Sequence, residues 1–306
     1  MTNRIKRNST PSRRTVLGLI AAGLGGALLS PGARAAGAGA TALAFAGDAL
    51  VAFAGGGLRR RAGDAAWQDL SAPGSVTALA AAPGRPDALF AGLAVGGVAR
   101  SADAGTSWQR PGRGLPAAPV TALATSFAAP GTLYAAVADD GLWTSSDDGA
   151  TWSLAMDRPW IAEAEREIAA LASVDIASGM GGIWVYAGTL VGLIRVPDCF
   201  CRWQEVVAGN AMEALVTGDA APPEMPLPAG EPVRALVSCP AAPERLAAAL
   251  PSGLWTSADA GVNWSRVAPL DAEALAVHPQ DPDRLAAIGA GGPAESRDGG
   301  ATWTDI

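Results

Sequence analysis

The octapeptide Ser101-Ala102-Asp103-Ala104-Gly105-Thr106-Ser107-Trp108 recurs along the 306-residue chain. Two further copies fit the same pattern, S-x-D-x-G-x-[ST]-W: Ser145-Ser146-Asp147-Asp148-Gly149-Ala150-Thr151-Trp152 and Ser296-Arg297-Asp298-Gly299-Gly300-Ala301-Thr302-Trp303. A fourth copy has Asn at its seventh position: Ser257-Ala258-Asp259-Ala260-Gly261-Val262-Asn263-Trp264. Two eroded copies end at Trp67 and Trp203. We call the four intact copies the octapeptide turns, and their repetition predicts a repeat architecture.

The residue types of the octapeptide favour a tight turn between two strands. Asp accepts hydrogen bonds from the backbone of the turn that it begins, and Gly adopts a positive φ without steric cost. Ser and Thr hydroxyls add local hydrogen bonds, and the Trp ring buries a large apolar area against the sheet. This chemistry fixes a hairpin and is not that of a catalytic centre.

Strand-like segments surround each octapeptide turn in the same order. A first strand is predicted at residues 76–80 and recurs at 120–124, 168–172, 233–237 and 272–276. A Pro-containing turn, a second strand, a third strand and the octapeptide turn follow, and a fourth strand begins at the tryptophan. Units of four short antiparallel strands, repeated every 39 to 61 residues from tryptophan to tryptophan, are typical of propeller blades. We therefore predict an all-β propeller of six four-stranded antiparallel blades, with a worn seventh blade near 206–231 as the alternative.

The octapeptide turns resemble the Asp boxes of BNR repeats, and the resemblance covers nearly all of residues 40–306. That superfamily includes bacterial sialidases, sortilin-type receptor propellers and photosystem II assembly factors. The resemblance implies that residues 36–306 form a single β-propeller domain. It implies no single activity, because one fold carries many functions.

The first 35 residues have the features of an export signal. Five basic residues precede an apolar stretch at 16–29, and Ala33-Arg34-Ala35 fits a cleavage site. Ser12-Arg13-Arg14-Thr15-Val16-Leu17 resembles a twin-arginine signal, which predicts a periplasmic or otherwise extracytoplasmic protein that is exported folded. An ordinary secretory signal or an uncleaved anchor is the alternative.

Removal of this segment makes the chain strongly acidic. It carries six of the 22 basic residues and no acidic residue, so 16 basic residues remain against 29 acidic ones, and the net charge changes from −7 to −13. Such a charge argues against nucleic acid or anionic lipid as the main partner. We expect a protein or peptide partner with a basic surface, no membrane insertion after cleavage, no metal and no cofactor.

The chain has three cysteines, Cys199, Cys201 and Cys239. An oxidising compartment permits one disulfide and leaves one free thiol. Because Cys199 and Cys201 are separated by a single residue, we predict that Cys239 pairs with one of them, and the sequence leaves open which.

The resemblance to sialidases raises one enzymatic alternative, a glycoside hydrolase acting on glycans. These enzymes use an arginine triad, a tyrosine nucleophile and an aspartate acid/base. Ile194-Arg195-Val196-Pro197 is similar to their arginine motif, but its repeat position predicts the third strand of blade 4. Tyr134 and Tyr186 fall where blade 2 has Phe90, which predicts core residues, and His278 falls at the entrance to a Pro-containing turn. We predict no catalytic residue.

Candidate binding residues lie on the face opposite the octapeptide turns, where the turns between second and third strands and the links between blades should gather. In the link between blades 3 and 4, Trp160 lies outside the repeat, beside Glu163 and Glu165. An apolar anchor among acidic residues is typical of a protein-binding rim, whereas a solvated loop with Trp160 folded onto the blade edges is the alternative. A second acidic, Pro-rich loop spans 206–231.

Arg234 and Glu273 occupy the same first-strand position in adjacent blades. We predict that they form a structural ion pair near the propeller axis, with ligand binding at the channel mouth as a secondary role. Together these features predict a non-catalytic, exported scaffold that binds a protein partner or assists complex assembly.

Overall fold

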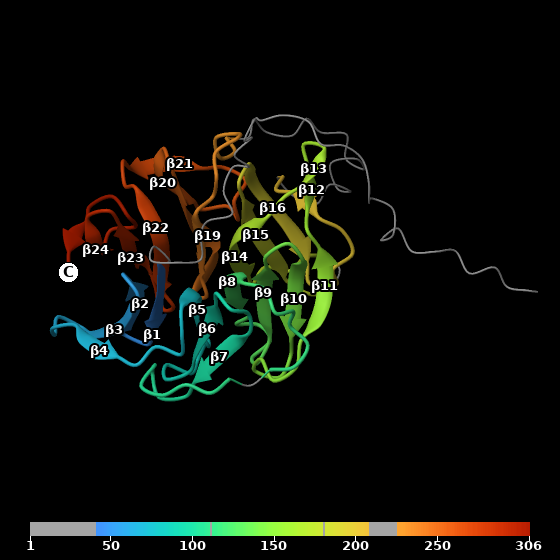
Figure 1. Ribbon diagram of the computed structural model, residues 1–306. Coiled ribbons are helices and arrows are strands. Elements are labelled where there is room, and N and C mark those ends of the chain that lie inside the picture. The colour runs from blue at the N-terminus through green and yellow to red at the C-terminus, as the bar shows by residue number, and fades with distance from the viewer. Residues whose placement is uncertain (1–40, 111, 180, 208–224) are drawn as a thin grey trace, which may run out of the picture. The chain divides into compact units, whose positions relative to one another are not determined.

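The computed structural model describes residues 41–110, 112–179, 181–207 and 225–306. It is a six-bladed β-propeller, as the repeats predict, and the described residues form strands and turns without a helix (Figure 1). No helix of this part of the chain is long and apolar enough to cross a bilayer. The predicted signal segment 1–35 lies outside the described residues.

Each blade is one antiparallel sheet whose strands follow chain order from the first strand to the last. Blade 1 contains β1 (Ala42–Ala46), β2 (Ala49–Ala54), β3 (Gly57–Ala62) and β4 (Gln68–Leu70). Blade 2 contains β5 (Val76–Ala81), β6 (Leu89–Leu93) and β7 (Val98–Ser101), with an isolated bridge between Arg100 and Gln109 in place of a fourth strand. Blade 3 contains β8 (Val120–Thr125), β9 (Leu133–Val137), β10 (Gly141–Ser145) and β11 (Ser153–Asp157).

Blade 4 contains β14 (Ile168–Val174), β15 (Trp184–Thr189), β16 (Gly192–Pro197) and β17 (Gln204–Glu205). Blade 5 contains β18 (Ala235–Cys239), β19 (Ala242–Leu250), β20 (Gly253–Ser257) and β21 (Ser265–Ala268). Blade 6 contains β22 (Ala272–His278), β23 (Asp281–Gly289), β24 (Gly292–Ser296) and β25 (Thr304–Asp305). A separate two-stranded hairpin, β12 (Trp160–Ile161) and β13 (Ala164–Glu165), links blades 3 and 4.

The first strands of the blades contact one another in a ring. β1 contacts β5, β5 contacts β8, and the series continues through β14 and β18 to β22, which returns to β1. Hydrophobic clusters fill the spaces between neighbouring blades. First and second strands are therefore buried on both faces, and their many alanines fit the narrow space near the axis of a propeller.

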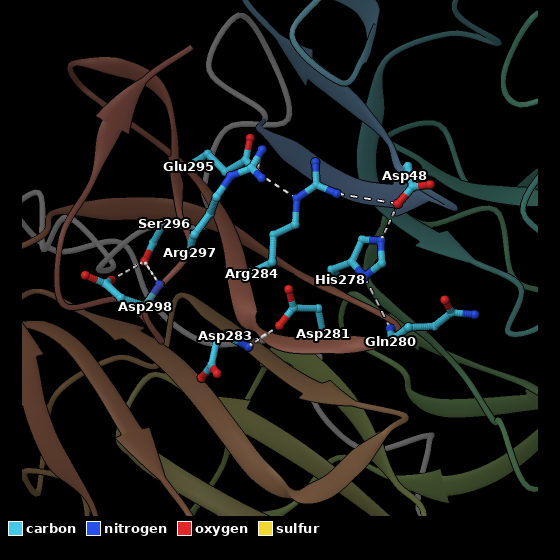
Figure 2. A network of polar contacts seen from close by, with 10 residues as sticks. All are labelled: Asp48, His278, Gln280, Asp281, Asp283, Arg284, Glu295, Ser296, Arg297 and Asp298. Carbon is cyan, nitrogen blue, oxygen red and sulfur yellow. Dashed lines mark hydrogen bonds and ion pairs between the residues drawn. The ribbon is translucent and has the colours of Figure 1, made fainter.

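Blade 6 and blade 1 meet at a seam that side chains hold together. Phe45 and Leu50 of blade 1 pack with Ala276 and Ile288 of blade 6. His278 Nδ1 accepts the N–H of Gln280, so its Nε2 donates to Asp48 Oδ1 at 3.0 Å (Figure 2). Arg284 Nε contacts Glu295 Oε1 at 2.6 Å, and the Arg284 guanidinium lies 5.0 Å from the centre of the Phe45 ring. The seam closes the ring without a strand shared between its two blades.

The four octapeptide turns share one hydrogen-bond pattern. The Ser hydroxyl donates to the Asp carboxylate at 2.8 Å and accepts the Gly N–H at 2.8–3.0 Å. The same carboxylate accepts the backbone N–H of the seventh residue at 2.8–2.9 Å. The Trp indole N–H donates to the Gly carbonyl at 2.7–3.0 Å, and that Gly has a φ between 81° and 94°. Each turn therefore ties its own hairpin together.

Acid should weaken these turns. The hydroxyl and backbone donors of the seventh residue, with the Ser hydroxyl, lower the pKa of Asp103, Asp147 and Asp298 from 3.8 to about 2. A carboxyl group whose pKa is lower in the folded state stabilises the protein above its unfolded pKa, and this contribution is lost as the pH falls through the folded value. We therefore expect the free energy of unfolding, measured by chemical denaturation, to fall between pH 4 and pH 2.

The matched variant for this pH dependence is Asp147→Asn, which cannot titrate at this position. It should show a shallower loss of stability over the same pH interval than the unmodified protein. An identical pH profile for the variant and the unmodified protein would contradict the role assigned to these carboxylates.

The cysteines pair differently from the prediction. Cys199 and Cys201 form a disulfide, and Cys239 is a buried free thiol. Phe200, between the first two, has a φ of 53° and turns the chain, which leaves the two Cα atoms 5.6 Å apart, within the range that a disulfide bridges. The prediction that Cys239 bonds to one of them is wrong, because it did not allow for a left-handed residue between the two cysteines.

The two ends of the sheets form two different faces. On one, which we call the turn face, each octapeptide turn bonds either the loop between the first two strands, as Asp148 N does with Gly131 O at 2.9 Å, or the start of the second strand. On the other, the link face, the turns between second and third strands bond the links between blades, as Ala138 N does with Pro119 O at 2.9 Å.

Candidate functional site

The hairpin β12–β13, which contains the predicted anchor Trp160, belongs to the link face. It follows β11, the last strand of blade 3, and precedes β14, the first strand of blade 4. Asp139 lies in the turn between β9 and β10. Its backbone N–H donates to Oε2 of Glu167, the residue just before β14, at 3.2 Å. The link therefore lies against the second-to-third strand turn of blade 3, as the sequence predicts for this face.

Arg158 holds the base of this hairpin. Its guanidinium contacts Asp139 Oδ1 at 3.3 Å and Glu165 Oε2 at 2.5 Å, and it also pairs with Glu167. The pKa of Arg158 is raised, chiefly by its hydrogen bond to Glu167. Asp139 belongs to a turn of blade 3, whereas Glu165 and Glu167 lie in and just after β13. Arg158, which precedes β12, therefore ties the start of the hairpin to both segments.

The tip of the hairpin is a two-residue turn with both residues in the left-handed region. Ala162 has a φ of 50° and Glu163 a φ of 60°, the conformations that match the twist of two paired strands. Arg166 adds two bonds across the turn, from Nε to the Ile161 carbonyl at 3.1 Å and from Nη2 to the Ala162 carbonyl at 3.3 Å. The hairpin is thus ordered by its own contacts.

Trp160 points away from the blades. It is 69% exposed, although a tryptophan is a residue that proteins normally bury in large part. Its strand partner is Glu165, and Glu163 lies exposed at the tip. The sequence leaves two alternatives, a Trp160 folded onto the blade edges and a Trp160 available to a partner. The structure has the Trp160 side chain exposed and not folded onto the blades. The hairpin brings Trp160, Glu163 and Glu165 together.

Other exposed apolar side chains occur on the same face. Val95, between β6 and β7, and Leu190, between β15 and β16, both lie in turns between second and third strands; Val95 is largely exposed and Leu190 about half-exposed. On the turn face, Phe127 lies half-exposed in the loop after β8. Trp160 is distinguished from these by its size and by the carboxylates beside it.

Arg234 and Glu273 do not form the predicted ion pair with each other. Among the described residues, Arg234 Nη1 pairs with Asp271 Oδ1, and Glu273 Oε2 accepts the Thr41 hydroxyl at 3.2 Å. Asp271 precedes β22 in the link from blade 5, so it reaches Arg234 more readily than the neighbouring strand position does. The repeat pattern aligns equivalent strand positions, whereas Asp271, which pairs with Arg234, lies in a link that has no repeat pattern.

The second predicted loop is described in part. Residues 208–224 lie outside the described residues, and with them Glu213, Asp219 and Glu224. Glu205, just before this loop, lies in β17 and pairs with Ile194, and Glu231, at its end, accepts the Ser252 N–H at 3.0 Å. These two carboxylates belong to different blades.

The residues weighed for catalysis lie in the core. Tyr134 and Tyr186 are buried, and burial raises the pKa of both hydroxyls. Tyr186 donates to the Ala260 carbonyl at 2.7 Å and accepts from Arg195 Nη1 at 3.3 Å. Arg195 lies in β16, the predicted third strand of blade 4, and its guanidinium stacks 4.1 Å from the centre of the Trp184 ring. These contacts pack the interior of blade 4 and join it to the octapeptide turn of blade 5.

Comparisons with known proteins identify the fold. No family model and no curated protein matches the chain. The GH74 xyloglucanase from Xanthomonas campestris superposes with a TM-score of 0.51 and 19% identity, over 86% of this chain and 45% of that enzyme. YCF48 bound to D1 peptide gives 0.47 and 17%, over 84% and 74%. PorZ, a surface component of the type-IX secretion system of Porphyromonas gingivalis, gives 0.49 and 16%, over 85% and 46%.

This chain spans less than half the length of the xyloglucanase that it matches. At such low identity, the likeness to that enzyme shows a β-propeller and nothing about activity. Any function must therefore come from the side chains of this chain.

Two structural features do not follow from the repeat pattern, one at the hairpin and one at the seam. Arg158 is a single cation among the carboxylates of this link, and such a pattern is a sequence signal for an ordered cluster. The sequence predicts His278 at the entrance to a Pro-containing turn, and in the structure it ends β22 and bonds Asp48 across the seam, 230 positions away in the sequence. Only the closed ring brings His278 and Asp48 together.

Proposed function

We propose that the protein is a non-catalytic, extracytoplasmic scaffold of the Asp-box type, which binds a protein or peptide partner on its link face through the hairpin β12–β13. Trp160 is the observation that carries the proposal. An ordered hairpin here exposes a large aromatic side chain to water, which is unfavourable in the free protein. The side chain gains apolar contact area when a partner covers it. Tryptophan is among the residues that most often dominate binding at interfaces.

The order of the hairpin supports the same proposal. Because Arg158 and Arg166 already fix its base and tip, binding loses little conformational entropy there. A flexible loop without such contacts would lose much more conformational entropy on binding.

The charge of the hairpin indicates the chemistry of the partner. Residues 157–167 contain four carboxylates, Asp157, Glu163, Glu165 and Glu167, against the two guanidinium groups of Arg158 and Arg166. Glu165, the strand partner of Trp160, and Glu163 at the tip lie beside the anchor, so a partner with basic residues around an apolar pocket is favoured.

Trp160→Ala should weaken this binding. Loss of an anchor residue typically costs about 2 kcal/mol or more, which corresponds to about a thirtyfold weaker complex. The measurement is capture of the partner by immobilised mature protein from a periplasmic extract, followed by titration of the captured partner against the variant.

Phe127→Ala is the matched control, because it removes a half-exposed aromatic side chain from the turn face. It should leave capture unchanged. Glu163→Lys should reduce the association rate at low salt, since it reverses a charge beside the anchor. Equal capture by Trp160→Ala and the unmodified protein would refute the proposed hairpin site.

A further inference from the structure

An axial cavity of about 700 Å³ is lined by residues from the first strand of every blade. Loops that follow the first strands also line it, so the cavity lies toward the turn face. At blades 1 and 2 its wall includes Ala44, Ala46 and Leu79 from the first strands, together with Arg60 of β3. A guanidinium group therefore borders the cavity beside apolar side chains.

The Arg60 guanidinium has no partner in the described part of the chain. Its Nε is buried and donates no hydrogen bond, and no described residue forms an ion pair or a hydrogen bond with its terminal nitrogens. A cation that is partly removed from water without a compensating partner is costly to the folded protein. A ligand that brings a negatively charged acceptor would offset this cost.

Two other blades carry an arginine at the equivalent third-strand position, and both of these arginines have partners. Arg60, Arg100 and Arg195 each lie opposite the corresponding residue of their second strand. Arg100 Nη2 lies 3.5 Å from Asp148 Oδ2, and Arg195 Nη1 donates to the Tyr186 hydroxyl at 3.3 Å. The Nε of all three arginines is buried without a partner, so Arg60 differs from the other two at its terminal nitrogens.

The partner of Arg100 identifies what blade 2 lacks. Asp148 is the fourth residue of the octapeptide turn in blade 3, and Ala104 is the fourth residue of the turn in blade 2. Both residues are in the left-handed region, with φ of 58° and 54°. Ala104 belongs to the same hydrophobic cluster as Leu58 of β3. Blade 2 therefore offers Arg60 a methyl group at the position from which blade 3 neutralises Arg100.

The carboxylates that line the cavity do not neutralise this guanidinium. Asp48 bonds His278 across the seam (Figure 2), and Asp175, after β14, accepts the Ser173 hydroxyl at 3.1 Å. Asp87 lies exposed in the loop before β6 and forms no ion pair with the guanidinium. Because these three groups are acidic, they repel a ligand with two negative charges more than a ligand with one.

Arg85 adds positive charge on the same side of the cavity, which it also lines. Both of its terminal nitrogens bind Asp148, and the same carboxylate lies within ion-pair distance of Arg100. This cluster carries two positive charges against one negative charge. The excess favours an anion at blades 1 and 2.

We infer that the axial cavity binds a small organic anion with a single carboxylate, which pairs with the Arg60 guanidinium while its apolar part lies against the first strands of blades 1 and 2. A guanidinium binds a carboxylate through two parallel hydrogen bonds. The volume of the cavity lies within the range of small-molecule sites. The cavity and the hairpin β12–β13 belong to opposite faces, so this inference does not rest on the proposed scaffold function.

Isothermal titration calorimetry of the purified protein at pH 7 with 2-naphthoate tests the inference. This monocarboxylate should bind with one-to-one stoichiometry. 2-Naphthamide, its uncharged counterpart, should bind at least about tenfold more weakly, because it cannot form a charge-assisted pair with the guanidinium. 2-Naphthyl phosphate should also bind more weakly than 2-naphthoate, because its second negative charge is repelled by the acidic residues of the lining.

Arg60→Gln should weaken 2-naphthoate binding at least about tenfold, because it removes the cationic donor. Arg59→Gln is the matched control and should leave binding unchanged. It removes the same charge from the adjacent residue of β3, which pairs with Asp69 and does not line the cavity. Arg60→Lys keeps the charge without the planar pair of donors, so its affinity should fall about three- to tenfold.

Ala104→Asp should compete with the ligand from within the protein. It places a carboxylate where Asp148 stands in the next blade, so Arg60 gains an internal partner and 2-naphthoate should bind at least about tenfold more weakly. Ala102→Asp adds the same charge at an exposed position of the same turn. Its affinity should stay within about twofold of the unmodified protein, because an exposed charge is screened by solvent and salt.

Three results would overturn the inference. The first is the absence of saturable one-to-one binding of 2-naphthoate. The second is binding of 2-naphthamide or 2-naphthyl phosphate as tight as that of 2-naphthoate. The third is an equal affinity of Arg60→Gln and Arg59→Gln for 2-naphthoate. Circular dichroism establishes that each variant is folded, and Arg60→Lys takes the place of Arg60→Gln in this comparison if the latter does not fold.

Discussion

Replacement of Trp264 by alanine is expected to lower the free energy of unfolding by about 3–5 kcal/mol, the usual cost of truncating a large buried aromatic side chain. Trp264 is 3% exposed and packs with Tyr186 and Leu246 in the cluster between blades 4 and 5. Its indole N–H also donates to the Gly261 carbonyl at 2.7 Å. The substitution therefore leaves a cavity between two blades and an octapeptide turn without its clamp.

Equilibrium denaturation with urea measures this loss. Trp160→Ala removes the same side chain from an exposed position, so its stability should change by no more than about 0.5 kcal/mol. If the two variants lost equal stability, the clamp role of the turn tryptophan would be wrong.

Phe45→Ala should cost a similar amount, about 3–5 kcal/mol, and should act at the seam between blades 6 and 1. Phe45 is 3% exposed; its ring meets the edge of His278 at 5.4 Å between centres and lies beneath the Arg284 guanidinium. Removal of the ring eliminates its apolar contacts. It also eliminates the surface against which His278 and Arg284 pack. The seam has no shared strand that could compensate.

Hydrogen exchange distinguishes this local effect from a general one. We expect β1 and β22 to lose more protection in Phe45→Ala than β8 and β9, which are far along the ring from the seam. Phe127→Ala, a truncation of an exposed ring, serves as the control and should leave all four strands protected. Uniform loss of protection across the blades would contradict a role specific to the seam.

The fold follows from the sequence because its signals are local. Each octapeptide turn carries within eight residues all the donors and acceptors that it uses, as Ser145, Asp147 and Trp152 show. First-strand positions recur with a similar pattern of burial from blade to blade, so a repeat unit predicts its own sheet. Blade number followed from counting these units.

The site was less predictable because its contacts join distant parts of the chain. Trp160 could be singled out, since it falls outside the repeat, but its exposure depends on how Arg158 and the blade 3 turn hold the hairpin. Asp271 captures Arg234 from a link without a repeat pattern.

The sheets of this ring are each made from one uninterrupted stretch of chain, from β1–β4 to β22–β25. Duplication or deletion of a gene segment that encodes one repeat would therefore add or remove a complete sheet and leave hydrogen-bond pairing in the other sheets unchanged. Such a chain can gain or lose whole repeat units during evolution. In a propeller whose last sheet combines strands from both ends of the chain, by contrast, both ends must be kept for that sheet to form. The same contiguity lets the intervals between neighbouring tryptophans differ as widely as they do here.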